Sequence, residues 1–510
     1  IKCNGWPAAI QMMAKNISHG TTDSDFKIGE TSNPLKILAL ESFASLNEEN
    51  QNSLLKLGIV EEFDLEAAAI ILGEDFSESY INKLATDGMF VSVSSGFQRT
   101  YRINPIIFTV LQELRNSKKD QELATHEKLA QYFISKGAPA EALDHIYKSG
   151  KTDQITEILR VSIRSMAAIG RGDQIIRWAH YGADESPAGA LIKKTIEAVG
   201  HLVNLDYERA EAMAAELNYV ADKDAQAEFL SQLAAMILSH VHFARGDFER
   251  TRVLIAKALA KDYGTVGIEN VDKIALLRLQ ADIAYIYDDA ELVASSLLRA
   301  KELQDGNNQI ITGYHIGCMT TMSLWCEGRF FEAAEHADIA ITQAQLMGYA
   351  SISAPLDAYM VLARCQLEQS HIEEAIETLS LIVEKASDAQ IWPWFFMAEG
   401  TRARINITKG QISQMMEIIK QQRDRVAHLK SPNELNWMID MTEVFLRFTL
   451  DDWERAEELL RRMPKTEMVR QIDLNARFQA DPKKIPAIVD AFPENTPRER
   501  VNKYLYQATI

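Results

Sequence analysis

The sequence lacks the features of several large classes of protein. None of its apolar runs approaches the roughly 20 residues that a membrane-spanning helix needs, and the N-terminus has no charged region followed by an apolar signal core. Its four cysteines, Cys3, Cys318, Cys326 and Cys365, show no C-x-x-C spacing and are too few to staple a chain of 510 residues. We therefore expect a cytoplasmic protein with buried thiols and no membrane partner.

Catalytic and metal-binding signatures are also missing. Gly150-Lys151-Thr152 ends like a phosphate-binding loop, but His145 stands where the first glycine belongs. His126-Glu127 lacks the second histidine of a zinc helix, Asp23-Ser24-Asp25 lacks the glycine and distal glutamate of a calcium loop, and no G-x-S-x-G occurs. We predict no catalytic residue, no metal site and no enzymatic activity; activity of this chain on a nucleotide would support the opposite view.

Positive charge is scarce. The chain has 54 Lys and Arg against 72 Asp and Glu, a net charge of -18. Such a chain is not expected to wrap nucleic acid by itself, because phosphate neutralisation needs clustered Lys and Arg. From Arg461 onward, however, ten Lys or Arg stand against six Asp or Glu. This segment is either a solvated terminus or the start of a basic region.

A short phrase that returns seven times dominates the rest of the sequence. Its copies begin at Leu205, Gly246, Asp288, Gly328, Ser370, Gly410 and Asp451. The third residues of the copies are Tyr207, Phe248, Ala290, Phe330, Ile372, Ile412 and Trp453, which are 40 to 42 residues apart. A fixed period of this length is typical of a solenoid, because one repeat cannot bury its apolar face alone.

Each phrase predicts a tight turn between two helices. Its first residue ends one helix, its third pins the turn, and a small residue three places later lets the next helix pack closely. That small residue is Ala210, Ala333, Ala375 or Ala456 in four copies. The pattern favours tetratricopeptide-like (TPR-like) repeats lengthened to about 41 residues, with armadillo or HEAT pairs as the alternative.

The N-terminal part follows another pattern. Pro7 predicts a helix start within 1–17, a polar stretch at 18–34 predicts a linker, and apolar spacing predicts helix over 35–57. Asp64 and Ser77 are candidate caps for helices over 65–72 and 78–85. Alternating residues at 89–93 and 99–103 predict a hairpin, and a helix follows from Pro105 to Leu114. Three helices, a hairpin wing and a further helix predict a winged-helix module.

Several motifs in order resemble the second half of MalT-type bacterial transcription activators, which are large STAND-class ATPases with a LuxR-type tail. They are Gly5-Trp6-Pro7-Ala8-Ala9, Leu54-Leu55-Lys56-Leu57, Leu84-Ala85-Thr86-Asp87-Gly88-Met89-Phe90, Tyr101-Arg102-Ile103-Asn104-Pro105 and Gly137 through His145. The resemblance covers almost the whole chain.

The resemblance implies parts of a switch. In the family an upstream domain binds ATP or ADP, the winged helix restrains that domain, the superhelix senses an inducer and a C-terminal helix-turn-helix binds DNA. Gly5 and Pro7 match the family's G-x-P motif, whose proline lies against adenine, and Asn104 stands where relatives often carry a phosphate-binding histidine. Alternatively, Pro7 is a first-turn proline and Asn104 a turn residue. Asn can donate a hydrogen bond but carries no positive charge.

The expected organisation is mainly α-helical. We expect the end of a nucleotide-associated helical module and a linker at 1–34, a winged helix at 35–115, helices leading into the solenoid at 116–200, the sensor solenoid at 201–465 and a C-terminal segment at 466–510. Thr496-Pro497-Arg498-Glu499-Arg500 is similar to the opening of a LuxR-type module, although chance also explains so short a string. The chain begins in a helical pattern at Ile1, so we expect a fragment of a longer protein, with no cofactor bound to this part.

Candidate ligand-binding residues cluster in the first helices of the middle repeats. The chain's densest aromatic run contains Trp392 and Trp394. Aligning the repeats on the seven copies of the phrase places Tyr359, Glu399 and Arg404 in the same region. First helices line the concave face of a solenoid, so these side chains could bind a polar small molecule. The same stripe could instead be core between repeats.

We therefore predict the regulatory portion of a MalT-like regulator, with an effector or a regulatory protein on the superhelix. The upstream nucleotide domain is an expected partner, contact with DNA is expected only through a C-terminal domain, and a homo-oligomer is expected on activation. The alternative is a TPR scaffold that binds proteins without nucleotide switching.

Overall fold

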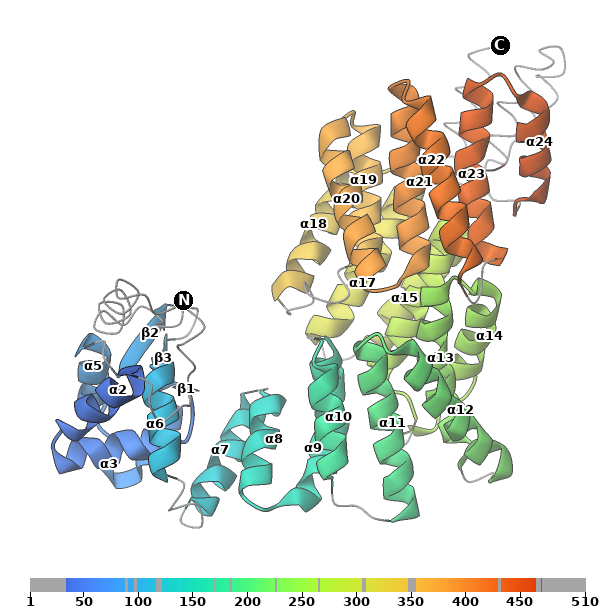
Figure 1. Ribbon diagram of the computed structural model, residues 1–510. Coiled ribbons are helices and arrows are strands. Elements are labelled where there is room, and N and C mark those ends of the chain that lie inside the picture. Colours follow the sequence, from blue (N-terminus) through green and yellow to red (C-terminus); the bar gives the residue numbers. More distant parts are fainter. Residues whose placement is uncertain are drawn as a thin grey trace. The chain divides into compact units, whose positions relative to one another are not determined.

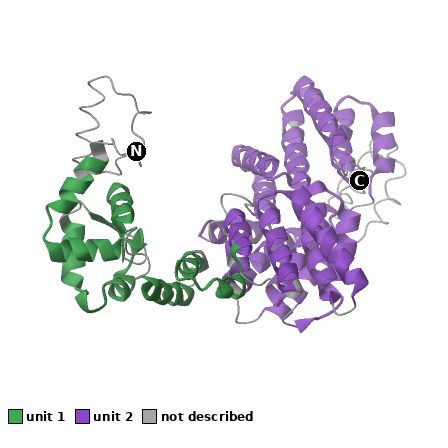
Figure 2. Ribbon diagram, turned by 60° about the horizontal axis from the view of Figure 1, so that its bottom comes forward, with its two compact units in different colours: residues 1–159, 181–183 green, residues 160–180, 184–510 purple. Residues whose placement is uncertain are grey.

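The computed structural model forms two compact units (Figure 2). Unit 1 comprises residues 1–159 and 181–183, and unit 2 comprises residues 160–180 and 184–510. The structure describes residues 34–464 and 469, apart from 88–89, 96–98, 116–121, 137, 169, 183–185, 225–226, 265–266, 305–308, 347–354 and 430–432. The helix predicted at 1–17 and the segment from 470 onward lie outside the described residues.

Unit 1 begins with a helical module that carries a small sheet (Figure 1). Its elements are α2 (Pro34–Ala44), α3 (Glu48–Leu57), β1 (Glu62–Phe63), α4 (Leu65–Leu72), η2 (Gly73–Asp75), α5 (Glu78–Asp87), β2 (Val91–Ser95), β3 (Arg99–Ile103), α6 (Pro105–Arg115), α7 (Leu123–Ser135), α8 (Pro139–Lys148) and η4 (Thr152–Gln154). The antiparallel sheet has the order β1-β3-β2, with Phe63 opposite Tyr101 and Val91 opposite Ile103.

The predicted caps and hairpin of this module are confirmed. Asp64 begins α4 by accepting a hydrogen bond from the Ala67 amide at 2.8 Å, and the Ser77 hydroxyl accepts one from the Tyr80 amide at 3.3 Å. These bonds satisfy amides that a helix start leaves without a partner. Strands β2 and β3 pair over five residues each, as the alternation predicted.

Two details differ from the prediction. The helix expected over 35–57 is two helices, because Asn47 adopts an extended backbone and accepts a hydrogen bond from the Asn50 amide at 2.9 Å, which starts α3. Strand β1 was not predicted. At two residues it is too short to show alternation, and its pairing with β3 depends on contacts about 40 residues away in the chain.

The core of this module extends beyond the wing. Tyr101, Ile103, Ile107 and Leu111 are fully buried with Leu54 and Leu57, and Leu129 of α7 belongs to the same cluster. The Tyr132 hydroxyl of α7 donates a 2.5 Å hydrogen bond to Asp64 Oδ2, so the cap of α4 also holds α7. The winged helix and α7 therefore share one core.

A buried histidine pair joins α7 to α8. His126 Nδ1 and His145 Nδ1 lie 2.7 Å apart, and His145 stacks on Phe133 at 5.3 Å between ring centroids. One nitrogen must donate and the other accept, so both rings are neutral with different tautomers. Burial lowers the pKa of His126 to about 4, with nearby Lys148 adding to the effect, and burial next to His126 lowers the pKa of His145 to about 3.

Acidification should therefore loosen α7 and α8. An unfolded histidine has a pKa of about 6.5, so between that pH and about pH 4 the unfolded state binds more protons than the folded one. The stabilisation is complete above pH 6.5 and should fall with decreasing pH, by at most about 1.4 kcal/mol per pH unit for each histidine. Hydrogen exchange of the α7 and α8 amides at pH 7, 6 and 5 measures it. A His126→Phe/His145→Phe variant that keeps the same pH dependence would contradict the explanation.

Unit 2 is a stack of helix pairs (Figure 1). Helices α9 (Ile155–Ala168) and α10 (Gly172–Tyr181) precede the pairs α11 (Pro187–Val203) with α12 (Tyr207–Lys223), α13 (Phe229–Arg245) with α14 (Phe248–Leu259), α15 (Asn270–Ile286) with α16 (Ala290–Leu303), α17 (Gln309–Cys326) with α18 (Phe330–Leu346), α19 (Leu356–Glu368) with α20 (Ile372–Asp388), α21 (Trp392–Thr408) with α22 (Ile412–Ala427) and α23 (Asn433–Thr449) with α24 (Trp453–Arg462). The predicted α-solenoid of helix-turn-helix repeats is confirmed.

The first residue of every repeated phrase adopts a left-handed backbone conformation. The φ angles are +61° at Leu205, +79° at Gly246, +54° at Asp288, +81° at Gly328, +64° at Ser370, +74° at Gly410 and +61° at Asp451. In the second copy the Asp247 amide donates back to the His242 carbonyl at 2.9 Å, which closes α13, and the Asp247 side chain accepts from the Arg250 amide at 3.2 Å, which opens α14. Two residues thus end one helix and begin the next.

The two helices of each repeat bury different amounts of surface. First helices such as α13 and α15 carry buried apolar residues on all sides, whereas second helices bury one face. Ala210, Ala333, Ala375 and Ala456, the small residues of the phrase, are fully buried as predicted. Cys318, Cys326 and Cys365 are buried within this stack.

Contacts between distant repeats close the first helices around an interior. The Tyr207 hydroxyl donates to the Ala389 carbonyl at 2.8 Å, and Glu434 accepts from the Phe248 amide at 2.7 Å. Phe243 of α13 lies 6.4 Å from Trp394 of α21 between ring centroids. Repeats separated by more than 140 residues of chain therefore touch directly.

Candidate functional site

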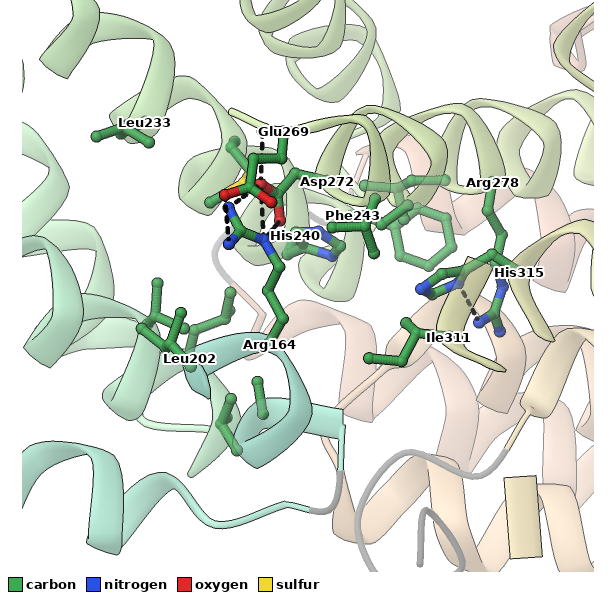
Figure 3. A pocket seen from close by; sticks show the side chains of 18 of the residues that line it. Arg164, Leu202, Leu233, His240, Phe243, Glu269, Asp272, Arg278, Ile311 and His315 are labelled. Carbon is green, nitrogen blue, oxygen red and sulfur yellow. Dashed lines mark hydrogen bonds and ion pairs between the residues drawn. The ribbon is translucent and has the colours of Figure 1, made fainter. Parts of the chain in front are cut away.

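A cavity of about 520 Å³ lies inside unit 2 (Figure 3). Its walls come from α9 and from the first helices α11, α13, α15, α17, α19 and α21, so it occupies the interior that the distant repeats close around. This volume is within the range of roughly 300 to 1,000 Å³ that is typical of small-molecule sites.

Most of the wall is apolar. Leu202 and Leu233 come from α11 and α13, Phe243 from the end of α13, and Ile311 from α17 (Figure 3). Trp394, which is 3% exposed, lies against Phe243 and Tyr285 and also lines the cavity. An apolar molecule placed here would lose contact with water, and most of the lining residues belong to helices, whose backbone groups are paired.

One end of the cavity is polar. The Arg278 guanidinium donates two hydrogen bonds to Asp357, from Nε to Oδ2 at 2.9 Å and from Nη2 to Oδ1 at 2.7 Å. Its Nη1 lies 3.2 Å from His315 Nδ1. Arginine only donates, so His315 Nδ1 is the acceptor and the proton of the neutral ring is on Nε2. In Figure 3 this second nitrogen points away from Arg278.

Asp282 and His240 complete the polar end. Asp282 lies one turn after Arg278 on α15 and is 5% exposed, and its Oδ1 has no hydrogen-bond partner within the part of the chain that the structure describes. Burial, together with the nearby Asp357 charge, raises the pKa of Asp282 well above its usual value and favours the protonated carboxyl.

Both pocket histidines are neutral. Burial lowers the pKa of His240 to about 4, and the positive charge of Arg278 lowers it further. Burial lowers the pKa of His315 well below its usual value, with contributions from Arg278 and His240. The polar end therefore has neutral rings, a neutral carboxyl and one paired guanidinium.

An ion-pair network lies on the α9 side of the cavity. Arg164 Nε is 2.9 Å from Asp272 Oδ1, Nη2 is 2.6 Å from Asp272 Oδ2, and Nη1 is 3.1 Å from Glu269 Oε1 (Figure 3). Asp272 also accepts from the Glu269 amide at 2.9 Å, which starts α15. Helix α9 is thereby tied to the first turn of α15, 108 residues later in the sequence.

The residues predicted to contact nucleotide are only partly placed. Gly5 and Pro7 lie outside the described residues. Asn104 is buried, and its side chain accepts a hydrogen bond from the Ile106 amide at 3.0 Å at the start of α6. Its amide donates to the Phe90 carbonyl at 2.8 Å. Asn104 thus holds the wing against α6, and its nucleotide contact stays a prediction.

The five residues predicted to bind an effector come from α19 and α21 and do not form one site. Trp394 lines the cavity, and Tyr359 packs half-buried against the same core. Glu399 pairs with Arg402 at 2.8 Å. Arg404 donates to Thr401 at 2.9 Å and lies over the Phe445 ring. Of the five, Trp394 alone is among the residues that line the described cavity.

Trp392 offers a clean test of the predicted aromatic site. It is half-buried, with Phe395 at 5.7 Å between ring centroids and Arg425 over its ring at 5.7 Å. Because it lies at the edge of the core, Trp392→Ala should leave the fold intact and lower Tm by only a few degrees, while removing any effector response that depends on it. Thermal unfolding and an effector titration of the same variant measure both. A collapse of Tm would instead assign Trp392 to the core.

Four residues of the polar end were not predicted. His240, Arg278, Asp282 and His315 come from three helices, and no repeat phrase contains them. One signal was present in the sequence: Arg278 and Asp282 stand four residues apart in the mainly apolar stretch 274–286, where a charged residue needs a buried partner.

Metal sites and membrane-spanning helices are both absent from the described part of the chain. Among the residues that the structure describes, no three His, Cys, Asp or Glu side chains are grouped to hold a metal ion. No helix within the described ranges has the length and apolarity needed to cross a membrane.

Comparisons with known proteins agree with the arrangement of unit 1. Residues 39–123 match the model of the MalT winged helix domain. The chain is 23% identical over 425 residues to the HTH-type transcriptional regulator MalT of Vibrio campbellii, and the match covers 73% of this chain and 46% of that protein. The chain thus spans about half the length of this relative.

A further match is the solved structure of a STAND protein with a tetratricopeptide repeat sensor from Pyrococcus horikoshii. The alignment covers 91% of this chain and 67% of the Pyrococcus chain, at 13% identity and a TM-score of 0.39. The family and sequence matches confirm the predicted resemblance: the chain carries a MalT-type winged helix domain and is distantly similar to a MalT regulator.

Proposed function

We propose that this chain, which joins a MalT-type winged helix to stacked helix pairs, is the sensor portion of a MalT-like, ATP-dependent transcription regulator in the bacterial cytoplasm. The cavity of unit 2 binds a small-molecule effector. The winged helix restrains a nucleotide domain that binds ATP or ADP, and DNA is contacted through a separate C-terminal domain.

The cavity among the first helices is the observation that carries this proposal. A scaffold that only binds proteins needs an exposed surface, whereas this cavity lies among first helices. The exposed apolar side chains Val253, Leu298 and Phe331 come from three different second helices, and scattered apolar residues are normal on a protein surface. The interior therefore favours a small molecule over a protein partner.

Helix α9 supplies the path from the cavity to the rest of the protein. It starts in unit 1 and reaches the cavity with Arg164, which holds Asp272 and Glu269. An effector that binds more tightly to one position of α9 than to another shifts the equilibrium between the off and on states by that difference in affinity. Activation of the whole protein, including its oligomerisation, follows from this shift.

Blocking the cavity tests the proposal. Ala275 of α15 lines the cavity, so Ala275→Phe should fill it, while Ala294→Phe on the exposed face of α16 is the matched control. In a thermal-shift screen of metabolites, a compound at about 100 times its Kd should add roughly 2.7 kcal/mol of stability to the original chain and to Ala294→Phe. The same compound should not change the stability of Ala275→Phe.

Two outcomes would contradict the proposal. An equal shift in Ala275→Phe would place the ligand outside the cavity. The absence of any shift, together with a purified regulatory protein that binds unit 2 equally well with and without the Ala275→Phe substitution, would favour the scaffold.

A further inference from the structure

We propose that the cavity of unit 2 takes a monocarboxylate, with the carboxylate at the polar end and an apolar body along the remaining wall. This inference rests on the proposed effector function and names the chemical class of the effector. It is carried by the arrangement of Arg278, His315, Asp282 and His240.

Beside Arg278 the polar end offers a donor, and the acceptors there already receive hydrogen bonds from Arg278. Both oxygens of Asp357 accept from Arg278. His315 uses Nδ1 to accept from Arg278, which leaves Nε2–H as a donor. A ligand group that fits here must accept hydrogen bonds, and a cationic amine does not.

Asp282 adds a donor that has no partner in the described parts of the chain. Its side chain is 5% exposed, and Oδ1 is buried without a hydrogen bond. Burial and the nearby Asp357 carboxylate raise the pKa of Asp282, which favours the form that carries the proton. A protonated carboxyl can donate to a ligand carboxylate, and an unsatisfied buried polar atom costs about 1 to 3 kcal/mol until a partner arrives.

The charge balance predicts proton uptake. Arg278 and Asp357 cancel, and both histidines are neutral in the empty cavity. A carboxylate adds one negative charge beside them and therefore raises their pKa values, so binding should draw up to about one proton at neutral pH. The groups that face the two histidines are Arg164 from α9, Asp272, Arg278 and Asp282 from α15, Tyr314 from α17 and Asp357 from α19.

The apolar part of the wall sets the body of the ligand. Leu202, Leu233 and Ile311 line the cavity, and Figure 3 shows Ile311 beside His315 and Leu202 and Leu233 on the far side of Arg164 from Arg278. Each buried methylene is worth about 0.8 kcal/mol, equivalent to a roughly four-fold change in affinity. Affinity should therefore rise with chain length until the cavity is full.

Isothermal titration of the whole chain with hexanoate, octanoate, decanoate and octanamide tests the proposal. Octanoate should bind about four-fold more tightly per added methylene than hexanoate and at least ten-fold more tightly than octanamide. Titrations in phosphate and in Tris, whose ionisation heats differ, should reveal the proton uptake. Ala275→Phe should abolish binding, and Ala294→Phe should not.

Two conservative variants separate charge from shape. His315→Gln keeps an acceptor for Arg278 and a donor for the ligand but cannot take up a proton, so octanoate should still bind while the uptake falls by about half. Asp282→Asn keeps a neutral donor and should change affinity by less than about three-fold. If the double variant His315→Gln/His240→Gln takes up as many protons on binding octanoate as the original chain does, the proposal is wrong.

The remaining outcomes distinguish this proposal from the effector function. If octanamide binds as tightly as octanoate without proton uptake, the carboxylate class is wrong and the effector function stands. The same conclusion follows if none of the four compounds binds but a compound found in the metabolite screen loses its binding in Ala275→Phe. If no compound binds and no screen hit depends on Ala275, both are wrong.

Discussion

Replacing Gly246 by alanine should destabilise unit 2 by about 2 to 5 kcal/mol. The residue has φ +79°, where an L side chain costs about 1 to 2 kcal/mol. An added Cβ would also lie 2.4 Å from Leu435 Cδ2 and 2.5 Å from Leu435 Cγ, so the buried Leu435 side chain of α23 would have to shift, at a further cost of about 1 to 3 kcal/mol. Urea unfolding of the chain, followed by its tryptophan fluorescence, measures the change.

Gly328 provides the matched control. It occupies the same position of another repeat with φ +81°, but an added Cβ there meets nothing within 4 Å. Gly328→Ala should therefore cost only the backbone strain, about 1 to 2 kcal/mol. Equal losses for the two variants would show that the contact between the Gly246 turn and α23 does not matter for stability.

Removing the Asp357 carboxylate should have a similarly large effect. Asp357→Ala leaves the Arg278 guanidinium in the interior without its two hydrogen bonds, which typically costs about 3 to 5 kcal/mol when one partner of a buried pair is lost. Thermal or urea unfolding of unit 2 measures the loss.

A double substitution distinguishes the stranded charge from the loss of packing. Arg278→Met/Asp357→Leu removes both charges and keeps similar volume, so it should recover most of the stability lost in Asp357→Ala. If the double variant is as unstable as Asp357→Ala, packing around the pair, and not the uncompensated charge, is the cause. In either case the double variant should no longer bind a carboxylate.

Local structure was predictable because its determinants are local. Asp64 and Ser77 cap helices through amides three residues ahead, and the alternation around 91–103 specifies a hairpin. The turns of the solenoid were also predictable, since a left-handed residue repeats at a fixed interval and a capping aspartate follows it in four of the seven copies. Such signals depend on neighbouring residues that the sequence shows side by side.

The site was less predictable because it depends on helices that meet only in the folded chain. Trp394 was predicted from an aromatic run and does line the cavity, whereas Glu399 and Arg404 of the same helix pair with residues nearby on that helix. His240, Arg278 and His315 come together through the stacking of three repeats, and periodicity describes the stacking without specifying which polar side chains face inward.

The contacts from Tyr207 to Ala389 and from Phe248 to Glu434 change how this repeat array should fold. In an ordinary solenoid each repeat touches only its neighbours, so repeats can nucleate anywhere and melt one by one. Here partners up to 186 residues apart must meet before the interior closes, which raises contact order and slows the search. The array should therefore unfold in a single concerted transition, and it should refold more slowly than an open superhelix of the same length.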